Sequence, residues 1–211
     1  MENVYHVAID GPVASGKGSV AKALAKRLDI AALDTGAMYR AYGLAMDALH
    51  QSHCNKIDLA AQIIDGETHV FINGEDVTNQ IRTAEAGRLA AKYATWPEAR
   101  NIINNLIREI AKTQSMVVEG RDICSIVLPN AKYKFYLTST PKVRAQRRLE
   151  QLRVDNPDLT LKDVTKQIKA RDKNDRKRAV APLKRACGAI KIDSSKLSLE
   201  ETVDLFLKLM N

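Results

Sequence analysis

The spacing of hydrophobic residues predicts strands that alternate with helices. Residues 4–9 (VYHVAI) form a short apolar run that ends at Asp10 and Gly11, a pattern typical of a buried strand. Residues 19–28 then place their apolar side chains at helical spacing. The chain therefore opens with a strand, a glycine-containing loop and a helix.

The same two patterns recur along the rest of the chain. They predict helices over residues 39–49 and 98–111, and Pro97 suits the first turn of the second helix. They also predict buried strands at residues 116–118, 134–137 and 189–192. The last prediction is a closing amphipathic helix at residues 199–210. Strands that alternate with helices favour parallel β-α-β units, so we expect an α/β fold with helices flanking a parallel sheet.

Two segments interrupt this alternation. Residues 69–82 combine short β-like runs with a turn at Asn73-Gly74, so we expect a small β insertion over about residues 67–83. Residues 154–182 are highly charged and helical in pattern with little apolar face, which predicts a mobile helical arm. We therefore expect a single domain, residues 1–211, whose core comprises residues 1–66, 84–153 and 183–211.

Composition places the chain among ordinary soluble proteins. Of its 211 residues, 45% are hydrophobic and 27% are charged, and no apolar run is long enough to cross a membrane. The first residues lack the basic and apolar regions of a secretory signal. Three widely spaced cysteines match neither a disulfide framework nor a metal clip. We expect a cytoplasmic monomer with reduced thiols and no membrane association.

Positive charge is concentrated in one quarter of the chain. Residues 132–185 contain 17 Lys and Arg against 6 Asp and Glu, whereas the rest of the chain has 16 against 19. This asymmetry suggests an anionic partner, either nucleic acid, a phosphorylated small molecule or an acidic membrane. Aromatic residues make up 5% and do not interleave with the basic ones, which weakens the case for single-stranded nucleic acid. A solvated basic face is the ordinary alternative.

The loop after the first strand has the pattern of a phosphate-binding loop, GxxxxGK. Its backbone N–H groups and the following helix N-terminus can surround a phosphate, while Lys17 supplies a positive charge. In many such loops a hydroxyl directly after the lysine ligates Mg²⁺, but here Gly18 intervenes before Ser19. We expect nucleotide oxygens and water to hold most of the Mg²⁺, with Ser19 a weak ligand and Glu119 a weaker candidate. The residues expected to bind ATP are Gly11, Pro12, Val13, Ala14, Ser15, Gly16, Lys17, Gly18 and Ser19.

Two clusters of arginine have helical spacing. Arg171, Asp175 and Arg178 share one face, where the carboxylate could bond ribose hydroxyls while the arginines bind phosphate. The alternative is an ordinary i,i+4 salt bridge on a solvated helix. Arg144 and Arg148 share another face with Arg147, and like charges there repel by about 0.2–0.5 kcal/mol per pair. An anion would reverse that sign, so we expect Arg144 and Arg148 to contact the phosphates of ATP, against the alternative of a solvated basic helix.

Three further motifs accompany the phosphate loop, namely DTGAMYR at residues 34–40, EGRD at 119–122 and RDKNDRKRAVAPL at 171–183. Together the four motifs resemble the bacterial cytidylate kinase family, and residues 74–83 resemble that family's extra β subdomain. The resemblance runs in order along nearly the whole chain. It implies a P-loop NTPase-type sheet, an acceptor-binding β insertion, a helical lid, and Mg²⁺-dependent transfer of phosphate from ATP to CMP or dCMP.

The resemblance also implies roles for individual residues. A pocket selective for cytosine needs an acceptor for the N4 amino group and donors for N3 and O2. Asp122 and Arg100 take these two roles in the resemblance, Arg40 and Arg121 bind the acceptor phosphate, and Thr35 lies beside the acceptor nucleotide. The alternative for Asp122 is a structural salt bridge with Arg121 or another basic residue. The residues expected to act on the transferring group are Lys17, Arg121, Arg171 and Arg178.

The chain departs from the family pattern at two places. Ala91 replaces a serine that helps to read the base in relatives, and Cys124-Ser125 replaces a Gly-Thr pair after the EGRD motif. Two other functions remain open from the residues alone. One is a P-loop kinase for a different monophosphate or a metabolite such as shikimate, and the other is a basic RNA-binding protein that uses residues 132–185.

Overall fold

A five-stranded parallel sheet forms the centre of the protein. The computed structural model describes residues 4–49, 57–153 and 156–211. The strand order is β2-β6-β1-β7-β8, and every neighbouring pair is parallel. The strands are β1 His6–Asp10, β2 Ala31–Asp34, β6 Met116–Gly120, β7 Tyr133–Thr138 and β8 Ile190–Asp193. The predicted α/β fold class is confirmed.

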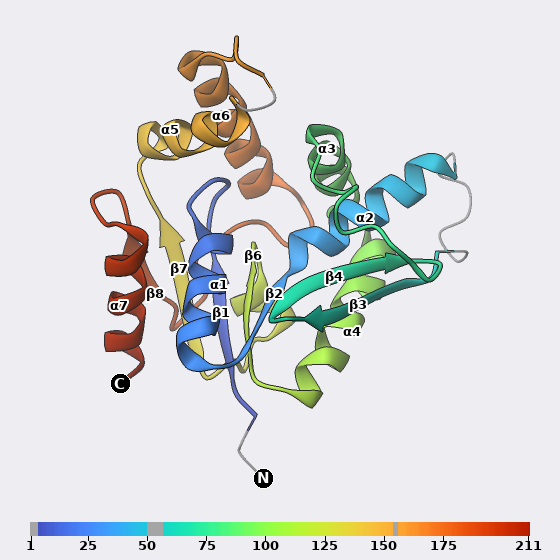
Figure 1. Ribbon diagram of the computed structural model, residues 1–211, viewed down its shortest axis with the longest axis horizontal. Coiled ribbons are helices and arrows are strands. Elements are labelled where there is room, and N and C mark those ends of the chain that lie inside the picture. The colour runs from blue at the N-terminus through green and yellow to red at the C-terminus, as the bar shows by residue number, and fades with distance from the viewer. Residues whose placement is uncertain (1–3, 50–56, 154–155) are drawn as a thin grey trace.

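Helices cover both faces of this sheet (Figure 1). Alternate side chains of β1 point in opposite directions: Val7 and Ile9 join one buried cluster, and Ala8 joins the other. The first cluster includes α1 (Lys17–Leu28) and α7 (Leu199–Met210). The second includes α2 (Thr35–Ala48) and α4 (Pro97–Thr113). Pro97 occupies the first turn of α4, as predicted.

The small sheet is antiparallel and begins earlier than expected. Its strands are β3 Leu59–Ile64, β4 Glu67–Ile72 and β5 Glu75–Asp76, followed by helix α3, Ala84–Tyr93. The expected start near residue 67 missed β3, because the sequence LAAQII offers little polar contrast. Helix α3 packs closely on α2, since a Cβ on Gly43 would lie 2.9 Å from the Cβ of Leu89. His50, His53 and Cys54 lie outside the described residues.

The charged arm forms a helix that packs on its neighbour. Helices α5 (Pro141–Leu152) and α6 (Leu161–Lys177) lie together beyond the carboxyl ends of the strands (Figure 1). The expectation that this arm has little apolar face was wrong. Val164 and Ile168 are buried against Ala145 and Leu149, and they give the two helices a small core of their own. The predicted motion of the arm stays a prediction.

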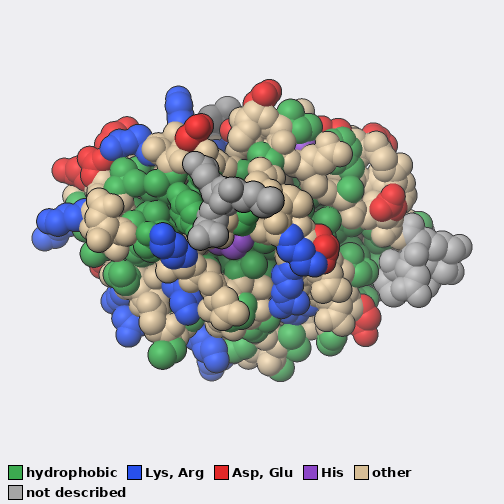
Figure 2. All heavy atoms as spheres, turned by 90° about the horizontal axis from the view of Figure 1, so that it is seen from below, with side chains coloured by type: hydrophobic (Ala, Val, Ile, Leu, Met, Phe, Trp, Pro, Cys, Tyr) green, Lys and Arg blue, Asp and Glu red, His purple; other side chains and the backbone are tan. Residues whose placement is uncertain are grey.

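The opposite face lies at the amino-terminal ends of the strands. On that face Lys and Arg side chains are interspersed with hydrophobic and uncharged ones (Figure 2). Within the described ranges, no helix combines the length and hydropathy that a membrane span needs. The basic helices α5 and α6 lie at the other end of the molecule, beyond the carboxyl ends of the strands. The phosphate loop and the EGRD motif follow the carboxyl ends of β1 and β6, so they lie at that end too.

Candidate functional site

The predicted phosphate loop joins β1 to α1. Gly16 lies at the start of α1 with a φ of 90°, and Ala14 also has a positive φ of 57°. Gly11 is required by close approach, because a Cβ there would lie 2.0 Å from the carbonyl oxygen of Leu137 on β7. The loop therefore has the strand-loop-helix context that a phosphate-binding loop needs.

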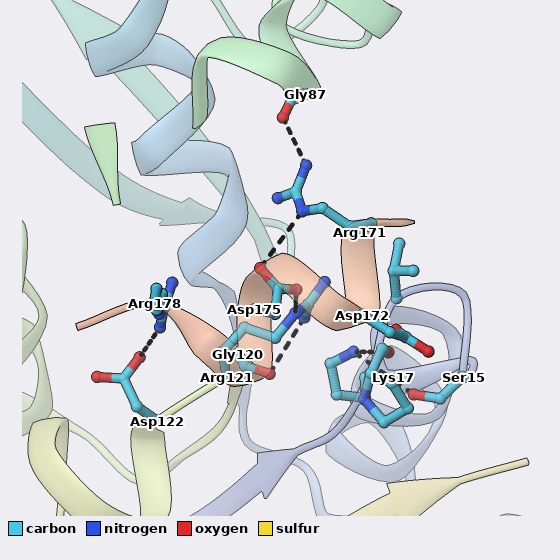
Figure 3. A network of polar contacts seen from close by, with 12 residues as sticks. Ser15, Lys17, Gly87, Gly120, Arg121, Asp122, Arg171, Asp172, Asp175 and Arg178 are labelled. Atoms are coloured by element: carbon cyan, nitrogen blue, oxygen red, sulfur yellow. Dashed lines mark hydrogen bonds and ion pairs between the residues drawn. The ribbon is translucent and has the colours of Figure 1, made fainter. Parts of the chain in front are cut away.

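Lys17 is folded back into this loop (Figure 3). Its side chain is 5% exposed, and its Nζ donates to the carbonyl oxygen of Pro12 at 2.9 Å. The carboxylate of Glu119 lies 4.0 Å from the same nitrogen. Burial, together with the positive charge of Arg121, lowers the pKa of Lys17 to about 7. An incoming phosphate would supply the negative charge that this buried amine lacks.

Two carboxylates meet at the ends of neighbouring strands. Asp34 of β2 pairs in register with Glu119 of β6, and Asp34 also receives a hydrogen bond from Arg40 at 2.7 Å. Burial, with the nearby charge of Asp34, raises the pKa of Glu119 to about 6. Sequence analysis assigned Asp34 no separate role, because no hydrophobic pattern marked the short strand β2 that it ends.

Oxygen donors for Mg²⁺ are present beside the phosphate loop. An Oε1 of Glu119 lies 3.6 Å from the position of a Cβ on Gly18, and the hydroxyl of Ser19 is on the exposed side of α1. Throughout the described segments, no group of three or more His, Cys, Asp or Glu side chains could form a metal cage. The residues present therefore fit a hard cation that keeps most of its water and nucleotide ligands.

Asp122 lies between two arginines. One oxygen accepts from Arg100 Nη2, and the other accepts from Arg178 Nη2 at 3.4 Å. Asp122 and Arg100 are each 5% exposed. The predicted base-reading pair is therefore brought together, and the predicted alternative, a salt bridge to a basic residue other than Arg121, is also present. These contacts leave the roles of the three side chains as predictions.

A second carboxylate, Asp175 of α6, also lies between two arginines (Figure 3). Arg121 Nε donates to it at 3.1 Å and Arg171 Nε at 3.4 Å. Arg171 also donates to the carbonyl oxygen of Gly87 on α3 at 2.9 Å. The i,i+4 contact expected on the arm is present, but the helix also bridges β6 and α3. Arg178 completes the expected trio only through its charge, which helps to lower the pKa of Asp175, while its Nε donates to Ala181 O at 2.6 Å.

The remaining acceptor residues lie on α2. Thr35 is 4% exposed, and its hydroxyl donates to the carbonyl oxygen of Glu119 at 2.8 Å. A cavity of about 50 Å³ is lined by Arg40 together with Asp34, Gly18 and Glu119. The start of α2 therefore lies beside the phosphate loop and the end of β6, and the acceptor-binding roles of Thr35 and Arg40 stay predictions.

Arg144 and Arg148 have different surroundings despite their shared helix face. Arg144 is 3% exposed and donates to Ser139 O, Val13 O and Asp172 Oδ2 at 3.0, 2.9 and 2.7 Å. Arg148 is half-buried, donates to Gln151 on its own helix, and its pKa is lowered by burial and by the positive charge of Arg40. Arg148 is thus the better placed of the two to meet a nucleotide phosphate.

This difference predicts separable effects of two alanine substitutions. We expect Arg148→Ala to lower kcat/KM for ATP about tenfold with little change in Tm, because one charge-assisted contact contributes about 1.5–3 kcal/mol. We expect Arg144→Ala to lower the free energy of unfolding by about 3–5 kcal/mol, because it leaves the buried Asp172 unpaired. ATP kinetics and thermal melts of both proteins measure this. A lower Tm for Arg148→Ala, with unchanged kinetics, would contradict the assignment.

Ala91 lies one helical turn after Gly87 on α3. Ala91 therefore lies on the same face of α3 as Gly87, whose carbonyl oxygen accepts from Arg171 of α6. We expect Ala91→Ser to lower the KM for CMP about twofold to tenfold, because one added hydrogen bond contributes about 0.5–1.5 kcal/mol. Acceptor kinetics at saturating ATP provide the measurement, with Ala84→Ser at the exposed start of α3 as the control. An unchanged KM and CMP:UMP ratio would place Ala91 away from the acceptor.

Comparison with known proteins agrees with this geometry. The sequence profile of the family described as Cytidylate kinase matches residues 7–211. The chain is 42% identical over 208 residues to "Cytidylate kinase" of Fervidobacterium nodosum, covering 97% of this chain and 95% of that protein. It is 44% identical over 207 residues to "Cytidylate kinase" of Thermosipho melanesiensis, with the same coverage.

Solved structures agree with the fold. The shikimate kinase from Acinetobacter baumannii, solved with shikimate, has a TM-score of 0.52 at 15% identity, over 99% of this chain and 94% of that one. At that identity the likeness concerns the fold alone. The family profile and the identity to curated relatives extend over almost the whole sequence, and on these findings the chain belongs to the cytidylate kinase family.

Proposed function

We propose that this protein transfers the γ-phosphoryl group of ATP to CMP or dCMP, giving ADP and the corresponding diphosphate. Its family membership supports this reaction. The observation that carries the proposal is the cluster of Asp122, Arg100 and Arg178 directly after β6, beside the phosphate loop. A carboxylate and an arginine are the groups that a cytosine edge requires.

The acceptor explains why the site needs no strong general base. The phosphate of CMP is already an anionic nucleophile, so catalysis is mainly positioning and neutralisation of charge. In this proposal Lys17 contacts the transferring group, and Arg40 and Arg121 hold the acceptor phosphate. In the free protein each of these side chains donates to a carboxylate or a carbonyl oxygen. In this proposal the phosphate oxygens of the bound nucleotides replace those acceptors.

Helix α6 is the proposed lid. Arg171 and Arg178 lie at its end, so its movement would bring both to the phosphates and exclude water from them. Ser19 and Glu119 are the residues that would help to hold Mg²⁺, which supplies positive charge to the phosphates when bound. A cytoplasmic monomer that binds neither nucleic acid nor membranes completes the proposal.

An ADP-release assay with ATP and Mg²⁺ tests the function. We expect turnover with CMP and dCMP, less with UMP, and almost none with AMP, GMP or shikimate. A preference for another acceptor would favour a different small-molecule kinase. No turnover with any of them, combined with RNA binding that weakens steeply with salt, would favour the RNA-binding alternative.

A further inference from the structure

Asp122 precedes a short π-helix without capping it. The helix comprises Ile123–Val127, and Asp122 stands immediately before it with φ −147° and ψ 24°. An Asp at this position commonly accepts hydrogen bonds from the first N–H groups of its own helix. Here its carboxylate makes no such bond and extends instead to Arg100 and Arg178. The N–H groups at the start of the helix therefore need another acceptor.

The acceptor is Asp10, from the other end of the sequence. Its Oδ1 accepts from the N–H of Ile123 at 2.8 Å, and its Oδ2 accepts from the N–H of Cys124 at 3.0 Å. The side chain is 1% exposed, so both bonds form away from water. Burial raises the pKa of Asp10 to about 6, against the opposing effect of the two N–H groups.

Asp10 itself is held firmly. It is the last residue of β1, it pairs in register with Gly120 of β6, and Gly11 follows it at once. The backbone at Gly11 runs close to β7, because a Cβ added there would lie 2.0 Å from Leu137 O. The single S–H of Cys124 has two acceptors within reach, Ala8 O at 3.4 Å and Phe135 O of β7 at 3.5 Å. Asp122 is thus anchored, through its two following residues, to the strand that carries the phosphate loop.

We propose that Asp10 is a positioning residue for base selection: it caps the π-helix in place of Asp122, which frees the Asp122 carboxylate and fixes it relative to the phosphate loop. This inference rests on the proposed function, in which Asp122 reads the cytosine. Asp10 touches neither nucleotide in this role. The two bonds of Asp10 explain how the phosphate loop and Asp122 keep a fixed relative position although they are more than a hundred residues apart in sequence.

The substitution Asp10→Asn tests the proposal. The amide has one oxygen, so one of the two N–H groups loses its acceptor and faces an NH₂ group. We expect the KM for CMP to rise and the CMP:UMP ratio of kcat/KM to fall about tenfold, as one charged hydrogen bond is lost, while the KM for ATP changes less than threefold. Asp204→Asn is the control, because it makes the same exchange at an exposed ion pair with Arg27, and it should leave the ratio within about threefold.

A double-substitution cycle with Asp122→Asn separates positioning from general support. If Asp10 acts through Asp122, adding Asp10→Asn to Asp122→Asn leaves the CMP:UMP ratio unchanged. A further fall by the same factor in that background, or equal losses for CMP and UMP in the single variant, would overturn the proposal. A wild-type protein that shows no preference for CMP would instead refute the proposed function.

A measurement on the wild-type protein covers the case in which Asp10→Asn does not fold. Hydrogen exchange at the amides of Ile123 and Cys124 should slow on addition of CMP, and less on addition of UMP, because only cytosine carries at position 4 an amino group that can donate to Asp122. Equal exchange with and without CMP would overturn the coupling between Asp10 and the base.

Discussion

Replacement of Lys17 by alanine should leave a folded protein whose kcat is lower by about 10²–10³. The reason is electrostatic: one preorganised contact to developing negative charge contributes about 3–4 kcal/mol to the transition state. The amine is buried at the start of α1, where it donates to the carbonyl oxygen of Pro12 and lies 4.0 Å from the carboxylate of Glu119. Steady-state kinetics with ATP, Mg²⁺ and CMP measure the loss.

The matched control is Lys22→Ala on the same helix. Lys22 is about half exposed and pairs with Glu67 on the surface, so its removal should change kcat by less than about twofold. A folded Lys17→Ala protein with turnover within threefold of the wild type would refute the phosphate-loop assignment.

Lys17 also predicts a pH dependence of stability. Burial lowers its pKa from 10.5 to about 7, so between these values the unfolded state binds more protons than the folded state. The contribution of Lys17 to the free energy of unfolding therefore rises with pH across this window. Lys17→Ala removes that contribution, so the variant should gain stability relative to the wild type as pH falls toward 7. Urea unfolding at several pH values measures the difference.

Asp122→Asn should lower kcat/KM for CMP by about 10–10², while UMP loses less or gains. A carboxylate that accepts from cytosine N4 contributes about 1.5–3 kcal/mol, whereas the amide accepts more weakly and can donate to O4 of uracil. The CMP:UMP ratio must therefore fall. Kinetics with both acceptors at fixed ATP decide the outcome, and equal losses for the two would assign Asp122 an architectural role.

The burial of Asp122 adds a stability effect to this prediction. Its two oxygens meet Arg100 and Arg178, and removing one charge from such a buried cluster costs up to about 3–5 kcal/mol. The kinetics of Asp122→Asn should therefore be measured at a temperature at which circular dichroism shows that the variant is folded. Asp204→Asn, at an exposed pair with Arg27, controls for the loss of one acidic charge.

The periodic parts of the chain predicted the fold class, and the short or polar parts did not. Strand β2 (AALD) has four residues and no alternation, so no pattern marked it. Helix α5 is rich in charge, and α3 is rich in alanine, so neither shows a wide apolar stripe. Helix α6 was misjudged for the same reason: two buried residues, Val164 and Ile168, are enough when another helix covers them.

In the candidate site, contacts within one helix could be predicted from the sequence, and contacts between distant elements could not. Spacing along one helix predicted the contact of Arg171 with Asp175, because that contact is local. The contacts of Asp122 with Arg178 and of Asp10 with Ile123 join distant elements, which only the sheet order brings together. Residues within a motif could be recognised, whereas the residue that anchors the motif from another strand could not.

The pairing of arginines with carboxylates in the free protein affects how substrates are discriminated. Asp122 and Asp175 each hold two guanidinium groups before any nucleotide arrives. A ligand that draws an arginine away must give the carboxylate a new donor, or the buried charge is left uncompensated. Cytosine can offer its amino group to Asp122, and uracil offers only an acceptor there. In the proposed function, every acceptor would therefore lose some affinity, and the wrong base would lose more because it breaks an ion pair that it cannot replace.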